Sequence, residues 1–350
     1  MRKARFHHVR SAEVAKRMAG WLLVSLASYL APANASVIKP DMVTLPEGVT
    51  GTAIQQTLDS LPASGGEVVL PAGKIEIAEP LILCRDNETL RGAGPTTILH
   101  LADNANCPVI IMGEPVNSPT QTVRHLLVTG LFIDGNRIHQ ARELWRLHGE
   151  GCQIRNNGIT IQGVSDSAVE NVKIARCRSG GLVTTRNVRR LLVSGLESCD
   201  NEFDGLACYQ TEDSVFNDLN LHDNPGAGIS LDLAFNNNVI SNAVLVANDL
   251  GIFMRASRQN QFLNVSIRQS HHHGVFMAQS EQRTANGWGP APKTECTRNS
   301  FTNLVAMNCG GVAFRVNNTT CTDNIIIRPQ FTGNVKGGLS EAQPDLVTMH

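Results

Sequence analysis

The sequence predicts an all-β fold, a single-stranded right-handed parallel β-helix with a capping helix at its N-terminal end. Glycines followed by short apolar alternations recur at intervals of 23, 24, 23, 23 and 23 residues, at Gly158, Gly181, Gly205, Gly228, Gly251 and Gly274. This period is too short for repeats of helical pairs, and the leucine-rich repeat pattern is missing. We therefore expect one coil per repeat, with regular coils over about residues 157–338.

Each coil stacks on the previous one at the strand spacing of roughly 4.8 Å, so residues at equal offsets from the glycine form columns. Offsets one and three are mostly apolar and are predicted to face the interior, while alternation turns offsets two and four outward, toward solvent. The series resumes at Gly311 after a gap of 37 residues, which predicts an inserted segment. Offset four then contains Gln162, Thr185, Tyr209, Asp232, Arg255, Ala278 and Arg315. Asparagines beside the second strand of each coil suit left-handed corners and ladders from coil to coil.

A short amphipathic helix is predicted in GTAIQQTLDSLP, with Thr52 as a possible N-cap and Pro62 as its stop. One face of this helix is apolar and holds Ala53, Ile54, Leu58 and Leu61. A solenoid exposes an apolar cross-section at its end, so we expect this helix to cover it.

Composition favours one exported domain. A net charge of -1 with 17% charged residues gives no field suited to nucleic acid or to an anionic membrane surface. Residues 1–35 combine basic residues, a short apolar run and the triplet ending at Ala35, which predicts a signal peptide cleaved near Ala35 and a domain over 36–350. No other transmembrane candidate follows. The expected location is periplasmic or secreted.

All nine cysteines follow the predicted cleavage site, where an oxidising compartment favours disulfides. Plausible pairs are Cys84 with Cys107 and Cys296 with Cys321, while Cys208 occupies an interior offset and is expected to be a buried thiol. No cysteine and histidine spacing suggests zinc, and we predict no metal or cofactor. A weak Ca²⁺ site from Asp204, Asp223 and Asp249 stays possible.

Two clusters could carry chemistry. Tyr209, Asp232 and Arg255 occupy three consecutive coils, and Arg315 continues the column; an arginine beside a tyrosine and a carboxylate suits proton abstraction next to a uronate carboxylate. The alternative is a ladder ion pair of Asp232 with Arg255. The second cluster precedes the glycines and holds Asp204, Asp249, His272 and His273.

Asp204 and Asp249 are two coils apart, roughly 10 Å, near the upper limit for an inverting glycosidase. The alternative is that these are ordinary corner residues. The two clusters are predicted to lie about 17 Å or more apart along the strands, too far for one catalytic centre.

Two insertions interrupt the repeat and hold Trp145 and Trp288, the only tryptophans left after signal-peptide removal. They are either sugar-stacking platforms, together with the outward Tyr209, or anchors for their own loops.

The helix, followed by GGEVVLPAGKIEI, ETLRGAGPTTILHL and coils of 23 residues, resembles the pectate lyase-like superfamily of right-handed β-helix proteins. That superfamily includes lyases, hydrolases, epimerases and phage or surface binding proteins. The segment EFDGLACYQTEDSVFNDL resembles a coil of alginate C5-epimerases, and this implies that Asp204 is catalytic. Their Tyr-Gly-Phe-Asp-Pro-His motif is replaced one coil earlier by GGLVTT.

Asp249, His273-Gly274 and Arg315 resemble motif residues of polygalacturonases, although Leu250 and Ala227 stand where that family has aspartates. The sequence thus predicts an exported protein that acts on a polysaccharide as a lyase or C5-epimerase. An acidic polysaccharide is favoured over a neutral one. The alternatives are an inverting glycoside hydrolase of polygalacturonase type and a non-catalytic polysaccharide-binding or surface protein.

Overall fold

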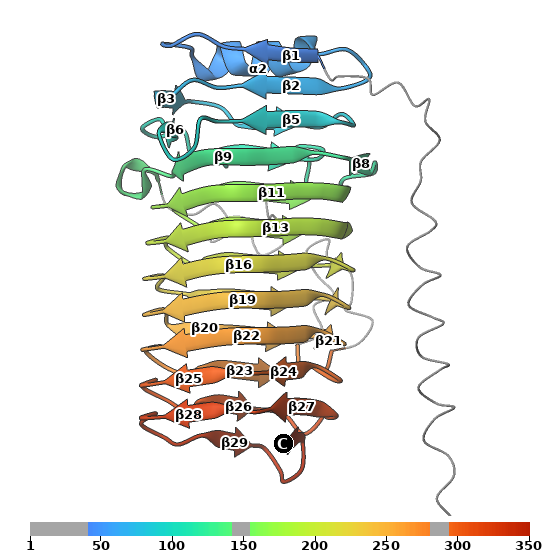
Figure 1. The fold of residues 1–350 in the computed structure, drawn as a ribbon, viewed down its shortest axis with the longest axis vertical. Coiled ribbons are helices and arrows are strands. Elements are labelled where there is room, and N and C mark those ends of the chain that lie inside the picture. Colours follow the sequence, from blue (N-terminus) through green and yellow to red (C-terminus); the bar gives the residue numbers. More distant parts are fainter. Residues whose placement is uncertain (1–40, 142–154, 281–293) are drawn as a thin grey trace, which may run out of the picture. The chain divides into compact units, whose positions relative to one another are not determined.

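The computed structural model describes residues 41–141, 155–280 and 294–350. Its strands stack coil on coil as a parallel β-helix, with α2 (Gly51–Ser60) over the first coils (Figure 1). One parallel sheet has ten strands: β4 (Leu81–Leu83), β7 (Ile110–Met112), β10 (Ile159–Gln162), β12 (Leu182–Thr185), β14 (Leu206–Tyr209), β17 (Ala227–Asp232), β20 (Leu250–Arg255), β23 (Val275–Ala278), β26 (Phe314–Val316) and β29 (Leu339–Glu341).

The other strands wrap around the rest of each coil and form the larger parallel sheet. Its early members are β1 (Asp41–Thr44), β2 (Gly66–Val69), β3 (Gly73–Ile77), β5 (Glu88–Arg91), β6 (Thr97–Leu101), β8 (Val123–Arg124), β9 (Leu127–Asp134), β11 (Val164–Ala175) and β13 (Val188–Cys199). Its later members are β15 (Thr211–Glu212), β16 (Val215–His222), β18 (Phe235–Asn236), β19 (Val239–Val246), β21 (Ser257–Arg258), β22 (Gln261–Arg268), β24 (Ser300–Thr302), β25 (Val305–Met307), β27 (Asn324–Ile327), β28 (Gln330–Thr332) and β30 (Val347–Met349). A single 3₁₀ turn, η1 (Arg137–His139), follows β9.

The helix α2 covers the N-terminal end of the coil stack, as predicted. Ile54 and Leu58 are fully buried there. The N-cap is Thr50 rather than Thr52, because the Thr50 hydroxyl accepts a hydrogen bond from the Ala53 amide (3.2 Å). This bond satisfies one of the unpaired amides of the first turn.

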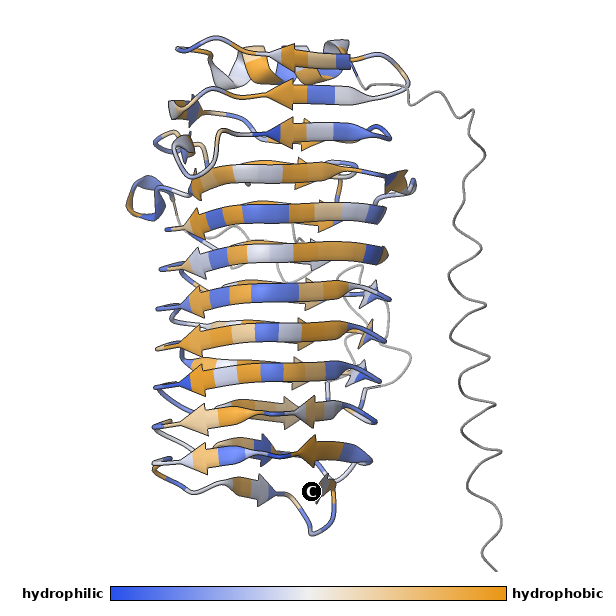
Figure 2. Cartoon of the chain, viewed as in Figure 1, coloured by the Kyte–Doolittle hydropathy of each residue, from blue (hydrophilic) through white to orange (hydrophobic). Residues whose placement is uncertain are grey.

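The glycine columns confirm the predicted register from β10 to β23. Ile159 pairs with Leu182, and Leu206 pairs with Ile229, so offsets one and three form the buried core. A Cβ on Gly251 would collide with the carbonyl oxygen of Gly274. The close approach of successive coils therefore accounts for the repeated glycine. Figure 2 shows the resulting alternation of hydrophobic and hydrophilic residues along many strands.

The predicted register is wrong in the last coils. Phe276 pairs with Arg315, and Val275 pairs with Phe314, so Ala313 and not Gly311 stacks on Gly274. The inserted segment is therefore two residues longer than predicted. Arg315 stands at offset two, in the column beside that of Arg255.

Outward positions are not always exposed, which corrects a second expectation. Gln162 is buried, and its amide donates to the carbonyl of Val116 (2.7 Å) in the segment between β7 and β8. Thr185 is also fully buried. The outward residues that end β10 and β12 are therefore shielded from solvent.

Asparagine ladders run along the corners as predicted. Asn201, Asn224 and Asn248 are buried, and the Asn224 amide donates to the Asn248 side-chain oxygen (2.9 Å). A second buried ladder contains Asn238, Asn260, Asn299 and Asn324. An exposed ladder holds the left-handed residues Asn242, Asn264 and Asn303. In the first buried ladder the left-handed conformation belongs to the preceding residue, for example Asp223 before Asn224.

The eight cysteines of the described ranges are thiols. Cys208 is fully buried, as predicted. The thiols of Cys296 and Cys321 are buried and hydrogen-bonded to each other, whereas Cys84 is exposed and Cys107 half-buried. No helix within these ranges is long and apolar enough to cross a membrane.

Candidate functional site

The candidate site lies on the outward face of the ten-stranded sheet, around β14. Asp204 stands just before this strand and Tyr209 ends it. Both residues line one pocket of about 200 Å³, together with Arg155, Phe203 and Ala207. The sequence places Asp204 and Tyr209 in two clusters too far apart for one catalytic centre. That prediction is wrong for these two residues, because it counted residues along the strand, whereas their side chains line the same pocket.

The Asp204 carboxyl is the most strongly perturbed acid of this pocket. Burial raises its pKa to about 6, although the Ala227 amide, the Ser230 hydroxyl and the Arg155 charge favour the ionised form. The Ala227 amide donates to Asp204 Oδ1 at 2.7 Å. This bond, made with the next coil, fixes the direction of the carboxyl. A carboxyl with a pKa near neutrality is suited to accept a proton as a general base.

The Tyr209 phenol is held in its neutral form. Burial and the negative charge of Asp204 raise its pKa well above the usual range. Tyr209 also packs against Leu233 and Ala256, which fixes the side chain near the pocket. A neutral phenol beside an ionisable carboxyl forms a proton donor next to a proton acceptor.

Asp232 and Arg255, which belong to the next two coils, form an ion pair whose carboxylate is buried. The Arg255 guanidinium donates to Asp232 Oδ2, and only 4% of the Asp232 side chain is exposed. Asp232 Oδ1 also accepts from the Leu233 amide (2.8 Å). The ladder ion pair that the sequence offered as an alternative is therefore formed.

A second hollow continues along the same face. Its volume is about 600 Å³, and Phe253, Arg255, Phe276 and Asn317 are among its lining residues. The rings of Phe253 and Phe276 stack with centroids 5.8 Å apart, with the Arg255 guanidinium 5.1 Å from the Phe253 centroid. Arg315 lies 5.8 Å from the centroid of Phe276. Paired aromatic rings with cations at their faces suit the binding of anionic sugar units.

The histidine cluster stands apart from the Asp204 pocket. His272 Nδ1 lies 2.6 Å from Asp249 Oδ1, at a corner where 68% of the His272 side chain is exposed. His273 Nδ1 accepts from the Val312 amide (3.1 Å), and its ring stacks on Phe276. Burial and the charge of Arg315 lower the pKa of His273. Neither Asp249 nor the two histidines line the pocket of Asp204.

The three carboxylates considered for Ca²⁺ have separate partners. Asp204 bonds to the Ala227 amide, Asp249 to His272, and Asp223 to His222 Nδ1 at 2.7 Å. They do not converge as a ligand group in the part of the chain described here.

Trp145 and Trp288 lie outside the described residues. Sequence reasoning did not single out Arg155, Ser230, Phe253 and Phe276. The two phenylalanines were detectable, because both stand at the outward offset two in consecutive coils. Arg155 could not be recognised from the repeat, because it lies in an inserted segment that has no equivalent in the other coils.

Comparison with known proteins confirms the fold. The family described as "Right handed beta helix region" matches residues 122–264. No curated protein matches the sequence. Among solved structures, ORF18 of Geobacillus virus E2 is 14% identical with a TM-score of 0.67, over 99% of this chain and 65% of that one. This chain therefore spans somewhat less than two thirds of the length of ORF18.

Two enzymes are also similar in structure. The A-module of mannuronan C-5 epimerase AlgE4 from Azotobacter vinelandii has a TM-score of 0.52 and 16% identity, over 86% of this chain and 95% of that one. An alginate lyase from Paenibacillus sp. str. FPU-7 has a TM-score of 0.62 and 10% identity, over 88% of this chain and 99% of that one. At such identities the likeness establishes the fold, and the predicted right-handed parallel β-helix is confirmed.

Proposed function

We propose that this right-handed parallel β-helix protein is exported and modifies a uronate-containing polysaccharide as a lyase or C5-epimerase, with Asp204 and Tyr209 at the reacting sugar. One observation carries the proposal: a carboxyl with a pKa of about 6 and a phenol with a raised pKa share a pocket with a cation, Arg155. Titratable groups whose pKa values are driven apart divide into base and acid.

In the proposed reaction Asp204 removes the proton at C5 of a uronate. The C5–H bond breaks, the proton passes to the carboxylate, and the electron pair is delocalised into the sugar carboxyl group. Arg155 offsets the charge that develops on that group, as preorganised cations do in other sites. The proton at C5 becomes acidic enough to be removed only when the negative charge on the sugar carboxyl group is neutralised.

The two outcomes differ in where Tyr209 places its proton. In elimination the C4–O4 bond breaks, Tyr209 protonates the departing O4, and a C4=C5 double bond forms. In epimerisation Tyr209 protonates C5 from the opposite face, and no bond between sugars breaks. In both cases the phenol regains a proton from solvent or from Asp204 before the next turnover.

The neighbouring hollow supplies subsites for the rest of the chain. Phe253 and Phe276 offer stacked rings, and Arg315, which lies at the Phe276 ring beside the hollow, adds a cation that suits a uronate carboxylate. Similarity to an alginate lyase and a mannuronan epimerase supports an acidic polysaccharide. Arg255 lines the hollow and pairs with the buried carboxylate of Asp232, and this pair is assigned to holding the face in shape.

The test incubates the exported protein with polymannuronate, polyguluronate, pectate and glucuronan in deuterated water. Ultraviolet absorbance detects the conjugated product of elimination, and NMR detects deuterium at C5 of the polymer. Either signal, lost in Asp204→Asn, supports the proposal. New reducing ends without either signal indicate hydrolysis, for which Asp204 and Asp249, together with His273, stay the candidates; binding without any reaction indicates a non-catalytic protein. Both of these results overturn the proposal.

Export has its own test. N-terminal sequencing of the protein recovered outside the cytoplasm should begin at Ser36. An intact N-terminus on cytoplasmic protein contradicts export.

A further inference from the structure

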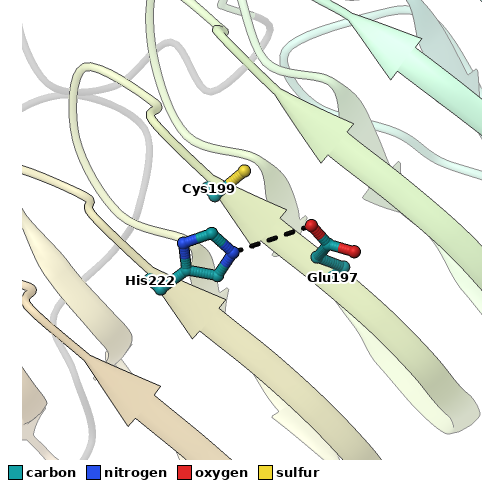
Figure 3. A group of neighbouring side chains, drawn as sticks. All are labelled: Glu197, Cys199 and His222. Carbon is teal, nitrogen blue, oxygen red and sulfur yellow. Dashed lines mark ion pairs between the residues drawn. The ribbon is translucent and has the colours of Figure 1, made fainter. Parts of the chain in front are cut away.

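Three side chains of metal-ligand type meet on the larger sheet, away from the candidate site. Glu197 and Cys199 end β13 and point to the same side of the strand, two residues apart, and His222 ends β16 (Figure 3). Cys199 and His222 are direct partners in the register. The ligand atoms of the three residues all lie within 4.8 Å of one another.

The spacing of two of these atoms suits a shared ion better than a direct bond. His222 Nε2 and Glu197 Oε1 are 3.6 Å apart, too far for a strong hydrogen bond. Two ligands at about 2.0–2.1 Å from one tetrahedral Zn²⁺ lie about 3.3 Å apart. The pair therefore needs to close by only a few tenths of an ångström around an ion.

A neighbouring carboxylate orients the imidazole for coordination. His222 Nδ1 lies 2.7 Å from Asp223 Oδ2, and a carboxylate can only accept, so Nδ1 carries the proton in this bond. In the tautomer with this single proton, the Nε2 lone pair faces Glu197 and Cys199. Carboxylate–histidine pairs of this kind fix the tautomer of metal-binding histidines.

We propose that Glu197, Cys199 and His222 bind a divalent cation with affinity for sulfur, of which Zn²⁺ is the representative. A thiolate, an imidazole and a carboxylate form a typical zinc ligand set, and water completes the fourth position. Cys199 is 8% exposed, whereas Glu197 and His222 are half-buried and leave a route from solvent. The ion would join two consecutive coils at their shared corner.

Lys173 is the group that competes with the cation. Its ammonium lies 2.7 Å from Glu197 Oε1, the oxygen that also faces His222. The Lys173 side chain is 37% exposed and also lies over the Phe132 ring, so it can turn away when an ion enters. Removal of the Lys173 ammonium should therefore strengthen cation binding by Glu197, Cys199 and His222. If these side chains formed only an ion-pair cluster without a metal, the same change would weaken the cluster.

The test uses the full chain, reduced and freed of metal with a chelator, and inorganic Co²⁺ and Zn²⁺ as probes. Co²⁺ should give a thiolate-to-cobalt charge-transfer band, and Zn²⁺ should abolish it. The band should be lost in Cys199→Ser. It should be kept in the control Cys84→Ser, which makes the same substitution at an exposed cysteine outside the cluster. Zn²⁺ should raise the melting temperature of the wild type and of Cys84→Ser, but not of Cys199→Ser.

Two surface substitutions keep the proposal falsifiable if Cys199→Ser fails to fold. Asp223→Asn should weaken Co²⁺ binding about tenfold to 100-fold, the usual effect of losing such a partner. Lys173→Met should tighten it several-fold. Absence of the cobalt band, its persistence in Cys199→Ser, or unchanged or weaker binding in Lys173→Met would overturn the proposal.

Discussion

The Asp204 carboxyl and the Tyr209 phenol share one pocket although they stand at opposite ends of strand β14. The charge of Asp204 raises the pKa of Tyr209, so the two groups interact electrostatically as well as by position. Tyr209 thus stays protonated over the whole range in which Asp204 changes from acid to base.

The first prediction is a pH dependence of activity. If Asp204 is the base, kcat/KM should rise with pH through an apparent pKa of about 6 in the free enzyme. A pH series with the polymer that reacts best provides the measurement. A rate that is flat between about pH 5 and pH 7 contradicts the assignment of Asp204.

The second prediction separates activity from stability in Asp204→Asn. The pKa of Asp204 is higher in the folded protein than in the unfolded chain, so ionisation of Asp204 lowers the free energy of unfolding. This loss is absent below the pKa of the unfolded chain, grows as pH rises, and is complete above about pH 6. Asp204→Asn should therefore abolish activity yet stabilise the fold at pH 7, by on the order of 1–3 kcal/mol. The gain should vanish near pH 3.8, the ordinary value for an aspartate.

Chemical denaturation at both pH values measures this difference. The side-chain amide introduced by Asp204→Asn keeps an oxygen that can accept from the Ala227 amide, so the substitution leaves that bond in place. Equal stabilisation at both pH values would show that the carboxyl is not perturbed by burial.

The third prediction concerns the phenol. Tyr209→Phe keeps the ring packed against Leu233 and Ala256 and removes only the hydroxyl. Loss of a general acid should lower kcat by about 10²–10⁴ with little change in melting temperature. Activity within a few-fold of the wild type would assign the proton transfer to another group.

The fourth prediction tests the buried ion pair. Arg255→Ala leaves the Asp232 carboxylate without its partner in a nearly buried position and should destabilise the fold by about 3–5 kcal/mol. The matched control is Arg189→Ala, which breaks a pair whose arginine is 54% exposed and should cost about 1 kcal/mol or less. Similar losses in the two variants would contradict a structural role for the Asp232 and Arg255 pair.

The fifth prediction concerns substrate binding beside the hollow, where the Arg315 guanidinium donates to the side-chain oxygen of the lining residue Asn317 (3.0 Å). Arg315→Ala should raise KM several-fold for an acidic polymer and leave kcat nearly unchanged, because Arg315 contacts Phe276 and lies outside the Asp204 pocket. Arg268→Ala, an exposed arginine on the larger sheet, is the control. An unchanged KM in Arg315→Ala places the polysaccharide elsewhere.

The sequence was sufficient for the coil architecture because one physical constraint repeats. Close approach at positions such as Gly251 demands glycine in every regular coil, and the alternation that follows assigns core and outer face. The same rule failed at Gly311, where a glycine outside the column imitates the repeat and displaces Arg315 by two positions. The position of a glycine in the sequence does not show whether it stacks on the glycine of the neighbouring coil.

The site was only partly predictable, for a different reason. Asp204, Tyr209, Asp232 and Arg255 are visible as columns, but their grouping depends on side-chain direction, which spacing along a strand does not give. Arg155 reaches the pocket from an insertion outside the repeat. Glu197, Cys199 and His222 meet only because two strands of the larger sheet end in register.

The most direct test of the central claim is exchange at C5 of the sugar. The wild type and Asp204→Asn are incubated with polymannuronate, polyguluronate, pectate and glucuronan in deuterated water, and deuterium at C5 and unsaturated ends are quantified by NMR. If Asp204 abstracts the proton, the wild type forms one or both products, in amounts that increase as pH passes about 6, and Asp204→Asn forms neither. Neither product with the wild type, or equal amounts from both proteins, would contradict proton abstraction by Asp204.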